Sequence, residues 1–255
     1  MTTVNFSLDL SGRTALVTGA SSGLGARFAK ILAKCGAKVA CTARRKDKLD
    51  ALVAQIRAEG GEAEAFALDV SDAAQLQAIV PTVADALGQP DILINNAGMV
   101  DAERATRMSL ELIDDVFDTN LRSVFILSNE FARPLIDKKM PGRIVNISSI
   151  AATQYDGHGA ALYSTTKAGV VRVTETLAVE WSKFHINVNA IAPGAFETEM
   201  LDGMLSRMGD FSVHFPRKRL GQPEQMDSTL LFLVSPSSDA VTGTVIKIDD
   251  GQGPR

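Results

Sequence analysis

The sequence is poor in cysteine, histidine and the larger aromatic residues. Its 255 residues include only 2 Cys, 3 His, 2 Tyr and 1 Trp. Two cysteines, Cys35 and Cys41, cannot form the disulfide framework of a small secreted domain. Both lie in apolar stretches, so we expect them to be buried free thiols. We expect no metal site.

The sequence also lacks a long basic run and a long apolar run. The net charge is −4 at pH 7, and the short basic clusters at 44–46 and 217–219 are most simply interpreted as solvated faces, so we expect no nucleic-acid partner. No apolar run reaches the length of a membrane span, and the run at 230–234 is expected to be a core element. Residues 1–6 do not resemble a signal peptide. These absences favour a cytoplasmic protein with no membrane partner.

The chain length suits one large α/β domain spanning residues 1–255. Apolar strand-like runs alternate with helical patterns, and strands are expected at 14–18, 37–42, 63–68, 91–94, 143–147, 186–191 and 244–248. Such alternation predicts parallel strands with helices on both faces. The predicted fold class is therefore α/β: a single-domain, doubly wound sheet of the Rossmann type with about seven strands.

Helical patterns fill the segments between these strands. They cover 23–35, the charged amphipathic stretch 45–59, a segment that Asp72 caps with Gln75 three residues later, and about 109–138. The segment 194–222 is irregular instead, and it holds Phe196, Met200, Met204, Met208, Phe211 and Phe215. This segment predicts either a flexible lid over a pocket or an insertion that packs on the core.

A glycine-rich stretch at 18–25 separates the first strand from the first helix. Glycine lets the chain turn tightly and lets a ligand approach its backbone. The free N–H groups and the positive end of the helix dipole would then face that ligand, for which a diphosphate is well suited. The spacing is G-x-x-x-G-x-G rather than G-x-G-x-x-G. A glycine-rich turn without a ligand is therefore the alternative.

Tyr163 and Lys167 are four residues apart and would share one face of a helix. A nearby ammonium favours the phenolate, so the pair could act as a general acid/base. They follow the predicted strand 143–147, after which come Ser148 and Ser149. Open α/β sheets bind ligands at the carboxyl ends of their strands, and only one of two successive hydroxyls can point toward such a site.

Asn120 interrupts an apolar helical stripe, because it lies four residues from both Val116 and Val124. A buried amide needs hydrogen-bond partners. The sequence leaves two interpretations open: a structural network, or a relay that holds a water molecule.

Together, these motifs resemble the short-chain dehydrogenase/reductase family over nearly the whole chain. The resemblance rests on segments 18–25 and 95–98, on Asn120, Ser149, Tyr163 and Lys167, and on segments 193–194, 242–243 and 249–251. Any one of these motifs would be a weak signal, whereas their shared order and spacing are specific.

The resemblance implies a role for each matching residue. Tyr163 resembles the general acid/base, Lys167 the residue that lowers its pKa and binds the nicotinamide ribose, Ser149 the hydroxyl that holds the substrate oxygen, and Asn120 the amide that holds a relay water. The residues implied to bind the cofactor are Gly19, Ser21, Ser22, Gly23, Leu24, Gly25, Arg44, Asp69, Val70, Asn96, Ala97, Gly98, Tyr163, Lys167, Pro193, Gly194, Phe196 and Thr198.

The end of the second predicted strand bears on the choice of cofactor. An acidic residue there would bind the ribose 2′-hydroxyl of NAD and repel a 2′-phosphate. Ala43 occupies that place and Arg44 follows it, and a guanidinium matches a phosphate in charge and geometry. The sequence therefore favours NADP(H) over NAD(H), although Ser22 stands where the family can carry a second basic residue.

The expected function is the NADP(H)-dependent interconversion of a secondary alcohol and a ketone, with a hydrophobic small-molecule substrate indicated by the apolar segment 194–222. Reduction of 3-oxoacyl carrier-protein thioesters is the alternative, ranked second because the resemblance would place arginines at Met140 and Val179. A nucleotide-sensing protein on the same fold could dispense with Tyr163 or Lys167. The family's assembly through its long helices implies a homotetramer.

Overall fold

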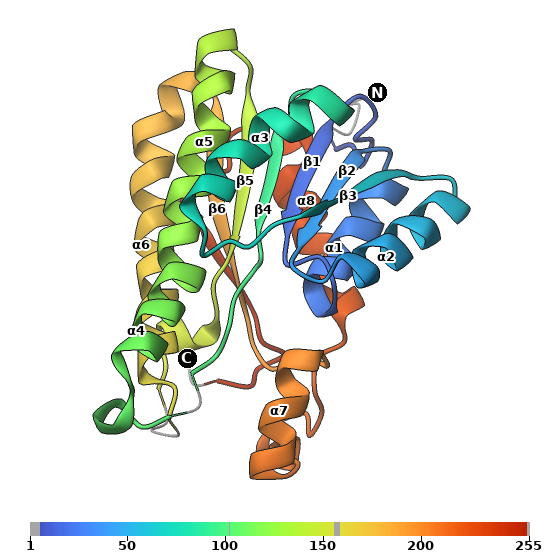
Figure 1. Ribbon diagram of the computed structural model, residues 1–255. Coiled ribbons are helices and arrows are strands. Elements are labelled where there is room, and N and C mark those ends of the chain that lie inside the picture. The colour runs from blue at the N-terminus through green and yellow to red at the C-terminus, as the bar shows by residue number, and fades with distance from the viewer. Residues whose placement is uncertain (1–5, 102, 156–158, 254–255) are drawn as a thin grey trace.

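The computed structural model describes residues 6–101, 103–155 and 159–253 (Figure 1). Residues 1–5, on which the expectation about a signal peptide mainly rests, lie outside these ranges. The described strands form one parallel sheet in the order β3-β2-β1-β4-β5-β6-β7. They are β1 (Thr14–Thr18), β2 (Lys38–Ala43), β3 (Glu62–Ala67), β4 (Ile92–Asn95), β5 (Gly142–Ile147), β6 (Ile186–Pro193) and β7 (Val245–Ile248). The predicted strands are confirmed, with ends displaced by at most two residues.

Helices cover both faces of the sheet, as predicted (Figure 1). One face packs against α1 (Gly23–Lys34), α2 (Lys46–Ala58) and α8 (Asp227–Val234), and the other against α3 (Ala73–Leu87), α5 (Ser123–Lys138) and α6 (Ala161–Trp181). Each face holds its own apolar cluster, with Phe28 fully buried on the first and Phe131 on the second. The run 230–234 belongs to α8 and is largely buried, which confirms the expected core element. No helix of the described residues is long and apolar enough to span a membrane.

The strand order creates a switch point between β1 and β4. The chain first builds outward through β2 and β3, then crosses to the other side of β1 to add β4. The chain after β1 therefore leads to α1 on one face of the sheet, whereas the chain after β4 leads to α5 on the other face. Open α/β sheets bind ligands at the carboxyl edge beside such a switch point. Helix α7 (Glu199–Met208) lies beyond the same edge, at the bottom of Figure 1.

The helical pattern at 109–138 is not one continuous helix. It divides into α4 (Leu110–Phe117), a π-helical turn (Asp118–Arg122) and α5. Asn120 lies in the π turn and is fully buried, where its amide oxygen accepts the Met99 N–H at 2.8 Å and its amide nitrogen donates to the Met99 carbonyl at 2.8 Å. Such turns within α-helices are frequent at functional sites. Here the turn brings a polar side chain of the helix against the loop that follows β4.

The segment 194–222 is more regular than expected. It contains α7 and a short helical turn (Phe211–His214), whereas the sequence analysis described the segment as irregular. Gly203 and Gly209 obscure the helical pattern, since glycine is a poor helix former. Phe196 is 4% exposed in the core, as an insertion that packs on the core requires, whereas Met200 is exposed at a cavity. A flexible lid stays a prediction.

Three smaller expectations can be compared with the structure. Cys41 is a buried free thiol, and burial raises its pKa to about 12, but Cys35 at the end of α1 is only half-buried. The basic cluster at 217–219 is exposed, as expected for a solvated face, and Arg217 and Arg219 both form ion pairs with Asp250 at the surface. The predicted helix cap is confirmed, since Asp72 accepts the N–H of Ala74 at 2.8 Å and of Gln75 at 3.3 Å.

Candidate active site

A cavity of about 1390 Å³ opens at the carboxyl ends of β1, β2, β4, β5 and β6. The structure brings most of the sequence-predicted site residues to its walls: Gly19, Ser21, Ser22, Gly23, Leu24, Arg44, Asp69, Val70, Asn96, Ala97, Gly98, Ser149, Tyr163, Lys167, Pro193, Gly194, Phe196 and Thr198. Gly25 and Asn120 lie behind the wall. One continuous cavity therefore joins the glycine-rich turn to the tyrosine–lysine pair.

The glycine-rich turn is packed too tightly for side chains. Gly19 has a φ of +66°, and a Cβ on Gly25 would lie 2.3 Å from the Gly19 carbonyl oxygen. The Thr18 hydroxyl accepts the N–H groups of Asn96 and Ala97, each at 3.0 Å, which joins the turn to the loop after β4. Gly25 thus packs against the backbone of the turn, on the side away from the cavity.

The start of α1 can receive an anion. Ser22 is the N-terminal capping residue of α1, but its side chain makes no capping hydrogen bond. The first N–H groups of a helix have no partner within the helix, and the helix dipole favours negative charge beside them. A diphosphate at this position would accept hydrogen bonds from these N–H groups, for which the Ser22 side chain does not compete.

Helix α6 presents Tyr163 and Lys167 to the other end of the cavity. Tyr163 is half-buried and hydrogen-bonded to the Ser149 hydroxyl, while the Lys167 ammonium lies 5.6 Å from the centre of the Tyr163 ring. Lys167 donates to the Ile147 carbonyl at 2.8 Å. Ser148 is 2% exposed, and its hydroxyl donates to the Lys167 carbonyl at 2.9 Å. Of the two adjacent serines, the structure therefore places Ser149 beside the tyrosine.

Burial controls the proton affinities of this pair. It lowers the pKa of Lys167 to about 8, because the charged ammonium loses its hydration. Burial also raises the pKa of Tyr163; the hydrogen bond from Ser149 opposes that rise, and the charge of Asp101 adds to it. In this structure the ammonium bonds the Ile147 carbonyl and burial sets the direction of the Tyr163 pKa. A lowering of that pKa by Lys167 stays a prediction. A protonated Tyr163 suits the role of proton donor.

Asp101 is a site residue that sequence reasoning missed. It is 2% exposed, and its carboxylate accepts the backbone N–H groups of Leu162 and Tyr163, each at 3.1 Å. It therefore anchors the first turn of α6 to the loop after β4. The sequence separation of 62 residues left no local pattern by which to find it.

The hydrogen bonds of Asn120 favour the structural interpretation of its side chain. Besides both backbone groups of Met99, its amide nitrogen reaches the Thr166 hydroxyl at 3.3 Å. Thr166 lies on α6 between Tyr163 and Lys167, so Asn120 connects the π turn to the helix that carries the pair. A role in holding a relay water stays a prediction.

The end of β2 carries basic side chains and no carboxylate. Ala43 is nearly buried there, and Arg44 extends from it along the cavity wall, exposed and without a hydrogen-bond partner in the described part of the chain. Arg45, which sequence reasoning did not assign to the site, donates from Nη2 to the hydroxyls of Ser21 at 2.9 Å and Ser22 at 2.8 Å. Its only signal in the sequence is its position next to Arg44.

These features fit a nicotinamide dinucleotide. The uncapped start of α1 suits the diphosphate, the end of β2 suits the adenosine ribose, and the tyrosine–lysine pair lies at the far end for the nicotinamide. The cavity is continuous between these points. In the described residues, no group of three or more His, Cys, Asp or Glu side chains could hold a metal ion.

Comparison with known proteins identifies the family. A family model described as short chain dehydrogenase matches residues 13–208. The chain belongs to the short-chain dehydrogenase/reductase family, and it is an oxidoreductase that acts on CH–OH and C=O groups.

Several relatives resemble the chain over almost its full length. A 3-oxoacyl-(acyl-carrier-protein) reductase of Thermotoga maritima is 36% identical over 245 residues, covering 96% of this chain and 99% of that protein. A short-chain type dehydrogenase/reductase of Mycobacterium marinum has a TM-score of 0.93 at 33% identity, covering 97% of this chain and 98% of that one. A variant actinorhodin polyketide ketoreductase, solved with NADPH, has a TM-score of 0.90 at 33% identity, covering 95% and 98%.

Proposed function

We propose that the protein is an NADP(H)-dependent oxidoreductase that interconverts a secondary alcohol and a ketone. The observation that carries the cofactor preference is Arg44, which lies exposed and unpaired among the described residues at the end of β2, beside an alanine where an acid would select NAD. The similarity to a ketoreductase solved with NADPH supports this choice.

The cofactor, when bound, supplies or accepts the hydride. The uncapped start of α1 would hold the diphosphate, Asp69 and Val70 the adenine, and the loop at 96–98 the adenosine ribose. Pro193, Gly194, Phe196 and Thr198 would form the wall near the nicotinamide.

The proton is handled by residues of α6 and the end of β5. Ser149 holds the substrate oxygen, and Tyr163 donates its proton to that oxygen as the hydride adds to the carbonyl carbon. In the reverse direction, Tyr163 takes the proton from the alcohol. Lys167 would bind the nicotinamide ribose, and its pKa of about 8 lets it return a proton toward Tyr163 near neutral pH.

The substrate end of the cavity is lined mainly by apolar side chains. Met200, Phe211 and Phe215 of the 194–222 segment face it together with Gln154 and His214. This segment is proposed as the substrate-binding part of one domain that spans residues 1–255, and the substrate class that fits it is a hydrophobic ketone.

A second candidate is the reduction of 3-oxoacyl carrier-protein thioesters. The full-length similarity to the reductase of Thermotoga maritima favours it. Against it, Val179 is 77% exposed on α6 and Met140 is half-buried, and neither supplies a basic side chain for an acidic carrier protein. We rank this candidate second.

The decisive experiment is an assay by the absorbance of NADPH. The wild type and Tyr163→Phe are each assayed with a panel of hydrophobic ketones and with a 3-oxoacyl thioester. The wild type should oxidise NADPH with at least one ketone, and the variant should lose about 10²–10⁴-fold in turnover while it still binds NADPH. A Tyr163→Phe variant with more than about a tenth of the wild-type rate would contradict the assigned proton donor.

The proposal extends to the assembly and location of the protein. Exposed apolar side chains on α4, α5 and α6, namely Leu110, Phe117, Phe125 and Val179, suit burial between copies of the chain. We expect a homotetramer in the cytoplasm. Light scattering that shows a monomer at micromolar concentration would contradict the assembly and leave the catalytic assignment untouched.

A further inference from the structure

A carboxylate of the 194–222 segment lies among the basic side chains at the end of β2. Glu199, the first residue of α7, accepts a hydrogen bond from Arg45 Nη1 at 2.9 Å and forms a second ion pair with Lys48 of α2. The hydroxyl of Ser22 also hydrogen-bonds Glu199. One acidic side chain thereby joins α7 to both α2 and the glycine-rich turn.

This contact is a small network rather than a single ion pair. Arg45 bonds Glu199 and Ser22 at the same time, and Ser22 in turn bonds Glu199. The hydrogen bonds from Lys48 and then Arg45 hold the pKa of Glu199 near 2, so the carboxylate is ionised at every pH at which the enzyme can be assayed. Each pair is about half-exposed, so its separate contribution is small and depends on salt.

The network lies at the end of β2, where the proposed function would put the 2′-phosphate of NADP(H). Glu199 lines the same cavity as Ala43 and Arg44, and Arg45 is held on the serines of the glycine-rich turn. A phosphate at the end of β2 would approach both guanidinium groups. It carries about −1.5 to −2 charges at neutral pH, so a neighbouring carboxylate on Arg45 repels it.

We infer that Glu199 competes with the 2′-phosphate of NADP(H) for Arg45, so that binding of the phosphate and attachment of α7 to α2 exclude one another. NAD(H), which has no phosphate there, leaves the attachment in place. Glu199 is thus a specificity-determining residue that weakens the preference for NADP(H) and links it to the position of α7. The inference rests on the proposed cofactor preference.

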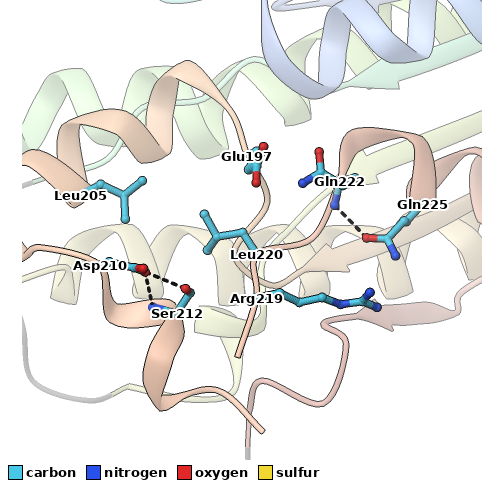
Figure 2. A pocket seen from close by; sticks show the side chains of 8 residues that line it. All are labelled: Glu197, Leu205, Asp210, Ser212, Arg219, Leu220, Gln222 and Gln225. Atoms are coloured by element: carbon cyan, nitrogen blue, oxygen red, sulfur yellow. Dashed lines mark hydrogen bonds between the residues drawn. The ribbon is translucent and has the colours of Figure 1, made fainter. Parts of the chain in front are cut away.

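The chain offers a matched control two residues away. Glu197 carries the same charge on the same segment, but it faces a separate cavity of about 630 Å³ that it shares with Leu205 and Gln222 (Figure 2). It does not line the cofactor cavity. Glu197→Gln therefore removes one negative charge from the segment without touching Arg45.

The first test measures the affinities of NADPH and NADH by nicotinamide fluorescence. Glu199→Gln should increase the affinity for NADPH about threefold, which is the size expected for an exposed charge pair. It should change the affinity for NADH less than about twofold. Glu197→Gln should change neither. In an Arg45→Gln background, the effect of Glu199→Gln on the affinity for NADPH should become clearly smaller, because only the direct repulsion between carboxylate and phosphate remains.

The second test follows hydrogen–deuterium exchange of the amides of α7 without cofactor. Exchange should be faster in Glu199→Gln than in the wild type and in Glu197→Gln. The inference is overturned if the two glutamine variants behave alike in either test, or if the effect on the affinity for NADPH is undiminished without Arg45. If the wild type prefers NADPH, such a result refutes the inference alone, whereas a wild type that binds neither cofactor refutes the proposed function as well.

Discussion

The carboxylate of Asp101 holds the start of the helix that carries Tyr163. One oxygen accepts the N–H of Leu162 and the other the N–H of Tyr163, both at 3.1 Å. These N–H groups belong to the first turn of α6 and have no acceptor within the helix. The buried carboxylate of Asp101 accepts charge-assisted hydrogen bonds from both of them. Through this contact, the loop after β4 fixes the tyrosine relative to the cofactor cavity.

Asp101→Ala should lower kcat by about 10–10²-fold, because a small displacement of the catalytic group is costly, while the affinity for NADPH changes little. Asp101→Asn keeps one acceptor oxygen and should restore part of the rate. Since the Asp101 charge raises the pKa of Tyr163, both variants should also move the alkaline limb of the kcat profile for reduction to lower pH. Steady-state kinetics over a pH series give both readouts. A profile that superimposes on that of the wild type would mean that Asp101 only stabilises the fold.

The two adjacent serines should separate in their effects. Ser149 touches Tyr163, whereas Ser148 is buried and bonds the Lys167 carbonyl. Ser149→Ala should lower kcat/KM by more than tenfold, because a hydrogen bond to the negative charge that develops on the substrate oxygen contributes about 1.5–3 kcal/mol. Ser148→Ala should mainly lower the free energy of unfolding, by about 1 kcal/mol. Kinetics and chemical denaturation of both variants check this, and the reverse order in kcat/KM would reassign the substrate-holding hydroxyl to Ser148.

The titration of Lys167 should appear in the pH dependence of stability. Its pKa is about 8 in the folded protein against an ordinary value of 10.5, so between these values the unfolded chain binds more protons than the folded one. The contribution of Lys167 to the free energy of unfolding must then rise with pH across this window. The difference between the wild type and Lys167→Met, measured by chemical denaturation at a series of pH values, should show that rise. The exposed Lys34→Met serves as the control, and a flat difference for Lys167→Met would show that the ammonium is not desolvated.

Sequence reasoning located what depends on local pattern. The strands follow from apolar runs, and the glycine-rich turn, Tyr163 and Lys167 follow from short fixed spacings, so the structure finds them where they were expected. What it missed depends on contacts between distant segments. Asp101 reaches α6 from another loop, and Glu199 meets Arg45 across 154 residues. No window of sequence contains both members of such a pair.

The pKa of Tyr163 shows a second limit of sequence reasoning. A spacing of four residues correctly places Lys167 on the same face of α6 as Tyr163, but it does not reveal which acceptor forms a hydrogen bond with the ammonium. The structure assigns Lys167 to the Ile147 carbonyl, and burial then decides the direction of both pKa shifts. Burial is a property of the assembled sheet and helices, not of the spacing.

The cofactor preference is the prediction that a single pair of substitutions can reverse. Arg44 should bind the 2′-phosphate of NADP(H), and Ala43 offers no carboxylate to the free hydroxyl of NAD(H). A charge-assisted contact of this kind contributes about 1.5–3 kcal/mol, so the wild type should bind NADPH at least about tenfold more tightly than NADH.

Ala43→Asp combined with Arg44→Ala should invert this order of affinities, because the new carboxylate accepts a hydrogen bond from the ribose hydroxyl and repels the phosphate. Fluorescence titration of both cofactors measures the ratio, with Lys34→Met as a control for a change of surface charge far from the cavity. Equal affinities in the wild type would mean that Arg44 remains in solvent when the cofactor binds, and a double variant that still prefers NADPH would mean that Arg45 holds the phosphate without Arg44.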